Sequence, residues 1–168
     1  MKRIVPVLAV LATAGVYFAW PRSASTEDPM GSNHVTTPHV MLTEADLKWS
    51  AGPPSLPSGA QFAILEGDPA KDGPFTMRIK VPAGWKVPPH THPAIEHVTI
   101  MSGSFSMGSG EVFDAKLLKD LPAGSFAVMP VGYKHFAMSK EGGTVQVHGM
   151  GPWDIKYVNP EDDPRNRK

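Results

Sequence analysis

The 168 residues are enough for one domain with a substantial hydrophobic core, and the formal charge of zero gives no basic face that would favour nucleic-acid binding. The absence of cysteine excludes disulfide bonds, thiolate catalysis and cysteine metal ligands. The 18 prolines and 16 glycines favour many short strands joined by tight turns over long helices.

Residues 1–25 have the pattern of a secretory signal peptide. Lys2 and Arg3 form a short positive region, residues 4–20 are uncharged and mainly apolar, and the small residues of the Ser-Ala-Ser sequence predict cleavage after Ser25. The apolar run is also at the lower limit for spanning a membrane, so an uncleaved anchor is the alternative. We therefore expect the folded part outside the cytoplasm, either periplasmic or secreted after cleavage, or membrane-anchored and facing outward.

The next segments predict a change from linker to strands. Residues 26–39 are polar and rich in Pro, Gly and Ser, which predicts a linker or disordered arm. In Leu42–Trp49, Thr43 and Asp46 have the spacing of an N-cap and its partner, which predicts one short helical turn. From residue 60 onward, alternating apolar residues and turn signals predict strands at Gln61–Leu65, Phe75–Val81, His97–Met101, Ser125–Met129 and Thr144–His148.

The last third of the chain predicts one insertion, a closing strand and a tail. Phe113–Asp120 has helical composition but is short enough to be a loop insertion. A closing strand is indicated by the alternating apolar residues Trp153, Ile155 and Tyr157. Residues 161–168 are mostly charged or polar, which predicts a disordered or loosely docked tail. The predicted domain thus spans roughly residues 40–160 and is all-β with one short helical insertion.

Three histidines and one glutamate lie within residues 90–97, which read HTHPAIEH. Residues an even number apart share a face of a strand, so His90, His92 and Glu96 point the same way if the segment is extended, and His97 points the other way. Imidazole nitrogens on one face can converge on an ion, and a carboxylate adds charge and an oxygen ligand. A His-x-His pair alone also occurs in ordinary surface loops, so this segment by itself leaves both interpretations open.

The wider spacing resembles the two sequence motifs of the cupin superfamily. The first motif, G-x5-H-x-H-x3-E-x6-G, is matched without a gap by Gly84, His90, His92, Glu96 and Gly103. The second motif, G-x5-P-x-G-x2-H, is matched by Gly124, Pro130, Gly132 and His135. The second motif usually ends in Asn, where this chain has Ser139. That departure affects a turn or capping position and leaves the ligand positions intact.

The resemblance implies a fold and a ligand set. It implies a single-domain cupin: a small antiparallel double-sheet jelly-roll barrel. It implies that one divalent transition-metal ion is bound by His90, His92, Glu96 and His135. Such ligands suit Mn, Fe, Co, Ni, Cu or Zn without choosing among them. Because family barrels often pair through sheet edges, the resemblance also implies that a homodimer can form.

The remaining histidines are expected to play smaller roles. His97 is an odd number of residues from His90, His92 and Glu96, so in an extended segment it does not share their face. We therefore expect His97 beside the metal site or on the outer surface. His148 either lines the barrel near the metal or is a hydrogen-bonded structural histidine. His34 and His39 fall in the predicted linker and are expected to be exposed to solvent.

A metal with one or two open positions can bind water or substrate. The family includes dioxygenases that cleave diketones or flavonols, oxalate-degrading enzymes and sugar isomerases, and we rank oxygen-dependent oxidation of a small organic molecule first. Oxalate chemistry ranks lower because it calls for an acid near the metal, whereas Glu111 and Asp114 sit in or beside the predicted insertion and Glu141 sits at a Glu-Gly-Gly turn. The alternative is a non-catalytic module that binds or senses a small ligand or metal. Fold alone does not decide between them.

Overall fold

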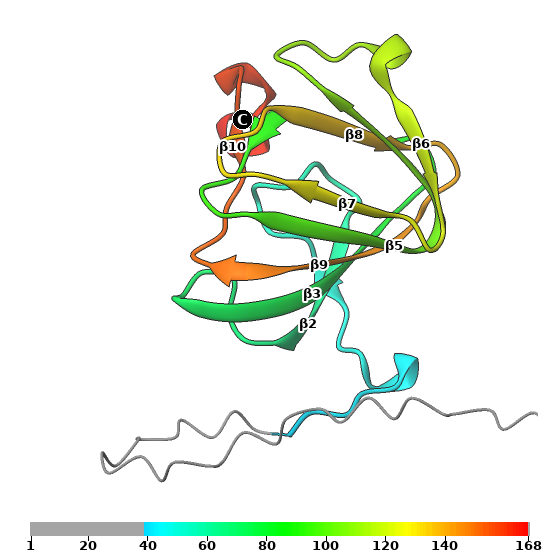
Figure 1. The fold of residues 1–168 in the computed structure, drawn as a ribbon, viewed down its shortest axis with the longest axis vertical. Helices are drawn as coiled ribbons and strands as arrows, with labels where there is room; N and C mark the ends of the chain where they lie inside the picture. Colours follow the sequence, from blue (N-terminus) through cyan, green and yellow to red (C-terminus); the bar gives the residue numbers. More distant parts are fainter. Residues whose placement is uncertain (1–38, 168) are drawn as a thin grey trace, which may run out of the picture. The chain divides into compact units, whose positions relative to one another are not determined.

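A computed structural model describes residues 39–167 of the chain (Figure 1). The predicted signal peptide, its alternative as a membrane anchor, most of the predicted linker and His34 lie outside these residues. Among the described residues, no helix is long and apolar enough to cross a membrane. His39 is exposed, as expected.

The described part contains ten strands and four 3-10 turns. In chain order they are η1 (Glu44–Asp46), β1 (Ser50–Ala51), β2 (Gln61–Glu66), β3 (Gly73–Val81), β4 (Trp85–Thr91), β5 (Glu96–Ser109), η2 (Ala115–Leu117), β6 (Lys119–Pro122), β7 (Phe126–Met129), β8 (His135–Ser139), β9 (Gly143–Gly151), β10 (Lys156–Tyr157), η3 (Pro160–Asp162) and η4 (Pro164–Asn166).

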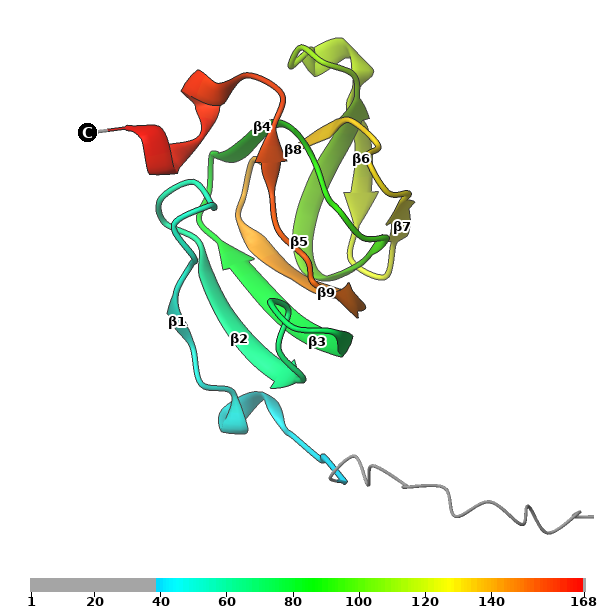
Figure 2. The same cartoon turned by 90° about the vertical axis from the view of Figure 1, so that its left-hand side faces the viewer.

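All strand pairs are antiparallel, and the long strand β5 belongs to two sheets. Neighbouring strands follow the order β1-β2-β3-β9-β5-β8-β4-β10, with β6 and β7 also paired to β5. Residues 96–103 of β5 pair with β7 and β9, and residues 104–109 pair with β6 and β8. In Figures 1 and 2, β2 and β3 lie at the opposite end from β6 and β8. The expected antiparallel double-sheet jelly roll is confirmed.

Gly103 lies where β5 passes from one sheet to the other. Its φ of 68° is in the left-handed region, and a Cβ atom there would lie 2.2 Å from the carbonyl oxygen of Gly142. Only glycine tolerates both the backbone conformation and this close approach. The glycine that ends the first motif therefore makes the corner that closes the two sheets around a common interior.

The interior is filled by the inward-facing residues of both sheets. In β3, Phe75, Met77, Ile79 and Val81 are buried while the intervening residues are partly exposed, as the sequence alternation predicts. Burying each such side chain contributes roughly 1.5–3 kcal/mol. Trp153, Ile155 and Tyr157 are also buried in this core, although only the last of them lies in strand β10.

The predicted N-terminal turn is present. The Thr43 backbone N–H and hydroxyl both donate to an Asp46 carboxylate oxygen, at 2.8 and 2.6 Å, and the turn runs from Glu44 to Asp46. Arg78 of β3 pairs with Glu44 at 2.5 Å, which fastens this turn to the outer face of the sheet.

The helical expectation for Phe113–Asp120 is correct for only one turn. Asp114 caps a 3-10 turn by accepting a hydrogen bond from the Lys116 N–H at 2.9 Å, and β6 begins at Lys119. Pairing of β6 with β5 takes up the backbone groups that a longer helix would need. Phe113 instead packs on Phe136, with ring centroids 4.8 Å apart.

The C-terminal residues differ from the expected loose tail. Residues 160–166 form two 3-10 turns, which are capped by Asn159 and Asp163. Arg165 binds back to the backbone and side chain of residues 154–155. The side-chain caps and Arg165 therefore give a defined structure to a segment whose polar, charged composition predicted a loose tail.

Candidate metal centre

The residues that match the two cupin motifs meet inside the barrel. His90 ends up near the end of β4, His92 follows that strand, and His135 begins β8. The three histidines are buried, and one nitrogen from each lies within 4.8 Å of the others. Glu96, at the start of β5, is also buried. We call these four residues the inner cluster.

A β-bulge in β4 turns the first two histidines inward. Val87 pairs with Ala137 of β8, and His90 pairs with His135, so two residues of β4 oppose one residue of β8. The bulge shifts the alternation by one position, and His90 therefore faces the same interior as Val87. The two bulge residues are Pro88 and Pro89, which have no N–H to donate to a ladder.

Glu96 approaches two of the three imidazoles. Its Oε2 atom lies 3.4 Å from Nε2 of His92 and 3.5 Å from Nε2 of His135. Its carboxylate is not part of the group of three that lie mutually within 4.8 Å. The structure thus brings the three histidines into one cluster and places the predicted fourth ligand beside it.

Backbone carbonyls orient all three imidazoles. Nδ1 of His90 lies 2.7 Å from the carbonyl oxygen of Pro88, and Nδ1 of His135 lies 3.0 Å from that of Tyr133. Nδ1 of His92 lies 2.8 Å from the carbonyl oxygen of Asp154. A carbonyl only accepts, so Nδ1 carries a hydrogen in each ring, and Nε2 offers its lone pair whenever the ring is neutral.

The charge states follow from burial and from these neighbours. Burial, together with the adjacent His135 and His92, lowers the pKa of His90 to about 3, so this imidazole is neutral near pH 7. Burial alone would raise the pKa of Glu96, but hydrogen bonds from His135 and His92 and their positive charge, both of which require a hydrogen on Nε2, outweigh it and hold that pKa below its usual range. Glu96 is therefore a carboxylate.

With neutral imidazoles, as metal binding requires, the inner cluster presents acceptors that face one another. The Nε2 atom of His92 is buried and has no hydrogen-bond partner. Lone pairs that converge with a carboxylate in an apolar interior are costly unless a cation lies between them. The donor set and its arrangement therefore fit a metal ion.

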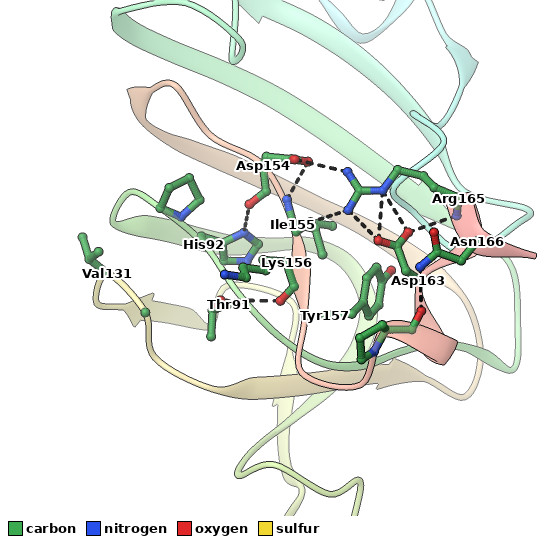
Figure 3. A pocket seen from close by; sticks show the side chains of 13 residues that line it. Thr91, His92, Val131, Asp154, Ile155, Lys156, Tyr157, Asp163, Arg165 and Asn166 are labelled. Atoms are coloured by element: carbon green, nitrogen blue, oxygen red, sulfur yellow. Dashed lines mark hydrogen bonds and ion pairs between the residues drawn. The ribbon is translucent and has the colours of Figure 1, made fainter.

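Two cavities adjoin His92. An interior cavity of about 60 Å³ is lined by the inner cluster and by apolar side chains, among them Trp85, Phe105 and Met107. A larger groove of about 630 Å³ lies on the outside, between His92 and the C-terminal turns (Figure 3). No other ionisable residue among those described lines the interior cavity.

His97 and His148, the outer pair, lie on the outer face of the sheet that contains β5 and β9. They are direct partners across β5 and β9, and their rings stack at 4.9 Å with an interplanar angle of 10°. The outer-surface alternative for His97 is therefore correct. Both expectations for His148 are wrong: it does not line the barrel, and its Nδ1 is buried without a hydrogen-bond partner. Burial, followed by the neighbouring His97, lowers the pKa of His148.

Two contributors to the site were not identified from the sequence. Trp153 stacks on His92, with ring centroids 4.6 Å apart and an interplanar angle of 16°. In the sequence, the alternation of Trp153 with Ile155 and Tyr157 indicated a strand, but it gave no sign that Trp153 stacks on His92. The Asp154 carbonyl that orients His92 is a backbone group, and no residue type marks it.

The jelly roll and its inward-facing histidines place the chain in the cupin superfamily. A family model described as the ChrR cupin-like domain matches residues 37–154, and the chain belongs to this family. No match is found among curated proteins.

Solved structures with the same fold have low sequence identity to the chain. The polyketide cyclase RemF from Streptomyces resistomycificus is 16% identical with a TM-score of 0.58, covering 74% of this chain and 89% of that one. A candidate acetylacetone dioxygenase from Methylibium petroleiphilum PM1 is 17% identical with a TM-score of 0.57, covering 76% and 85%. An RmlC-like cupin from Ralstonia eutropha JMP134 is 20% identical with a TM-score of 0.56, covering 73% and 74%. At these identities the likeness shows the fold alone.

Proposed function

We propose that the chain binds one divalent transition-metal ion at the inner cluster and catalyses oxygen-dependent oxidation of a small organic molecule. The observation that carries the metal proposal is the convergence of three lone-pair nitrogens and a carboxylate in a buried site. Nitrogen and oxygen ligands of this kind suit Mn, Fe, Co, Ni, Cu or Zn. When bound, such an ion supplies Lewis acidity or the capacity to react with oxygen.

The protein's own part is to orient the ligands and to exclude water. The carbonyls that accept from Nδ1 keep each Nε2 available, and apolar side chains surround the cluster. Outside this cluster, the cavity has no group that could act as an acid or base. This supports oxidation over oxalate chemistry, because Glu111 pairs with Lys134 at the surface and Asp114 caps a turn.

The size of the cavity restricts the substrate. Ligand pockets typically measure about 300–1,000 Å³, and one water occupies about 30 Å³ of the liquid. The interior cavity, at about 60 Å³, therefore admits a very small molecule or only the reacting end of a larger one. The dioxygenase among the structural neighbours supports this reaction class as a proposal, since its name refers to a small diketone.

The same small cavity favours a second candidate, a module that holds a metal or small ligand without turning it over. One experiment separates the two. The full chain is purified, its metal content is measured by elemental analysis, and oxygen uptake is followed with diketones, flavonols and organic acids. Uptake that His90→Ala abolishes and His97→Ala preserves supports the oxidase proposal. Bound metal without uptake on any compound supports the binding module. The absence of bound metal contradicts the oxidation proposal and a metal-holding module, and leaves only a module that binds a small ligand.

We further propose that the protein acts in the periplasm or after secretion, on the basis of the pattern in residues 1–25. Cell fractionation with mass analysis of the N-terminus tests this. A soluble product that starts at Thr26 supports cleavage, a full-length product in the membrane supports the anchor, and a full-length cytoplasmic product contradicts both.

A further inference from the structure

We infer that Arg165, in the second C-terminal turn, is a positioning residue that holds the imidazole of His92 in its metal-binding orientation. The inference rests on the proposed metal binding at the inner cluster. It concerns a residue that lies outside both sequence motifs and outside the barrel strands.

The three histidines are not oriented in the same way. His90 and His135 each bond to the carbonyl two residues earlier in the chain, so the neighbouring backbone orients them locally. His92 bonds instead to the carbonyl of Asp154, which is 62 residues away. The orientation of His92 therefore depends on how firmly a distant segment is held.

That distant segment is held by few backbone hydrogen bonds, although the side chains of Trp153 and Ile155 are buried in the core. Residues 153–155 lie between β9 and β10 and belong to no strand. The Trp153 N–H donates to the Pro69 carbonyl at 2.7 Å, which fixes the start of the segment. Beyond this bond and the burial of the two neighbouring side chains, the contacts of Asp154 and Ile155 help to keep the Asp154 carbonyl directed at His92.

Arg165 contacts the side chain of Asp154 and the backbone of Ile155, on either side of the peptide bond that joins these two residues (Figure 3). Its Nη1 donates to the Asp154 carboxylate at 3.2 Å, and its Nη2 donates to the Ile155 carbonyl at 2.9 Å. The other carboxylate oxygen of Asp154 accepts from the Ile155 N–H at 2.7 Å. The guanidinium thus brackets the one carbonyl that orients His92.

The guanidinium is itself held in place. The Asp163 carboxylate accepts from Nε at 2.8 and 3.1 Å, from Nη2 at 2.7 Å and from the Arg165 N–H at 3.0 Å. The planar fork of arginine makes such paired contacts specific, whereas lysine presents a single point charge. Arg165 therefore acts as a rigid link between the turn at Asp163 and the segment that orients His92.

The chain provides a matched control two residues further on. Arg167 belongs to the same tail and carries the same charge, but its side chain is 64% exposed and its ion pair with Asp162 is 3.9 Å long. Arg165 is 38% exposed. Removing Arg167 changes the net charge equally without releasing the segment at residues 153–155.

The test measures the dissociation constant of Zn²⁺ by calorimetry for the full chain and for Arg165→Gln, Arg165→Lys and Arg167→Gln. Partners that orient a metal-ligating histidine typically contribute 10- to 100-fold in affinity, and we expect Arg165→Gln to weaken binding about 10-fold. We expect a smaller loss for Arg165→Lys and none for Arg167→Gln. Equal affinities for Arg165→Gln and Arg167→Gln would overturn the inference.

A second readout does not require metal. Long-range nitrogen–proton NMR of the metal-free protein reports the Nδ1–H of each imidazole, and it also shows whether the variants are folded. We expect Arg165→Gln to shift the His92 Nδ1 signal and speed its hydrogen exchange, with His90 and His135 unchanged. If wild-type protein binds no Zn²⁺ but His92 alone responds, the positioning role stands and the proposed metal function fails. Equal or absent changes at all three rings contradict the positioning role.

Discussion

The histidines of the inner cluster face the interior of the barrel and those of the outer pair lie on its outside, and only the inner cluster forms a site. Glu96 and His97 are consecutive in β5 and face opposite sides. Inside, each Nδ1 has a carbonyl partner, and one nitrogen of each imidazole lies within 4.8 Å of the others. Outside, the two rings stack and their Nδ1 atoms have no partner. Anchoring carbonyls and convergent lone pairs, rather than histidine content, therefore distinguish a metal centre.

The largest difference between the inner cluster and the outer pair is expected in metal affinity after substitution of one histidine by alanine. His90→Ala removes a ligand from the inner cluster, and we expect metal affinity to fall at least 100-fold, beyond the loss typical for an orienting partner. His97→Ala removes an imidazole from the other face and leaves affinity unchanged. Calorimetric titration with Zn²⁺ checks both variants, and a similar loss in each would contradict the distinction.

Glu96→Gln separates metal binding from stability. The amide has the shape of the carboxylate but no charge, so we expect at least 10-fold weaker metal binding. Its NH₂ group can donate to the lone pairs of His92 and His135, so the metal-free protein should gain about 1 kcal/mol in unfolding free energy. Urea denaturation with and without metal measures the two effects. A variant that loses stability without metal would show that the carboxylate supports the fold.

The pH dependence of stability tests the burial of His90. Its folded pKa of about 3 lies below its ordinary value of 6.5, so the unfolded chain takes up the proton first as the pH falls. Stability from this group is complete above pH 6.5 and is lost between pH 6.5 and about 3, at up to about 1.4 kcal/mol per pH unit. Denaturation of metal-free protein across this range should show a shallower slope in His90→Asn. An unchanged slope would mean that His90 is not buried in its neutral form.

The smallest effect is expected on the outer face. His148→Phe keeps the stack on His97 and removes a buried nitrogen that has no partner, so unfolding free energy should rise by about 0.5–1 kcal/mol. Metal affinity should not change. The control is His39→Phe at an exposed position, where no gain is expected. A loss of stability in His148→Phe would mean that the outer imidazole has a partner in solution.

The resemblance to the two cupin motifs was sufficient to predict the jelly roll and the four residues that meet in the inner cluster. Strand alternation correctly predicted that His97 and Glu96 face opposite sides, because β5 is regular at that point. Alternation alone would have put His90 and Val87 on opposite faces of β4. They face the same side because the bulge at the two prolines shifts the alternation by one residue. The position of such a bulge depends on the partner strand, which the local sequence does not describe.

Other features depend on contacts between distant segments. His148 faces outward because β9 pairs with β5 in the register that sets it opposite His97. Neither strand alone reveals this register. The hydrogen bond from His92 to Asp154 involves a backbone carbonyl, and the order of the tail depends on Arg165 reaching residues 154–155. Composition correctly described the tail as polar but did not predict where its arginine binds.

Anomalous diffraction from crystals of the full chain grown with Zn²⁺ tests the central claim most directly. The account predicts one peak at the zinc edge, about 2.0–2.1 Å from Nε2 of His90, His92 and His135 and about 2.0–2.2 Å from a carboxylate oxygen of Glu96. A peak at the outer pair of His97 and His148, or no ordered peak at the inner cluster, would contradict it.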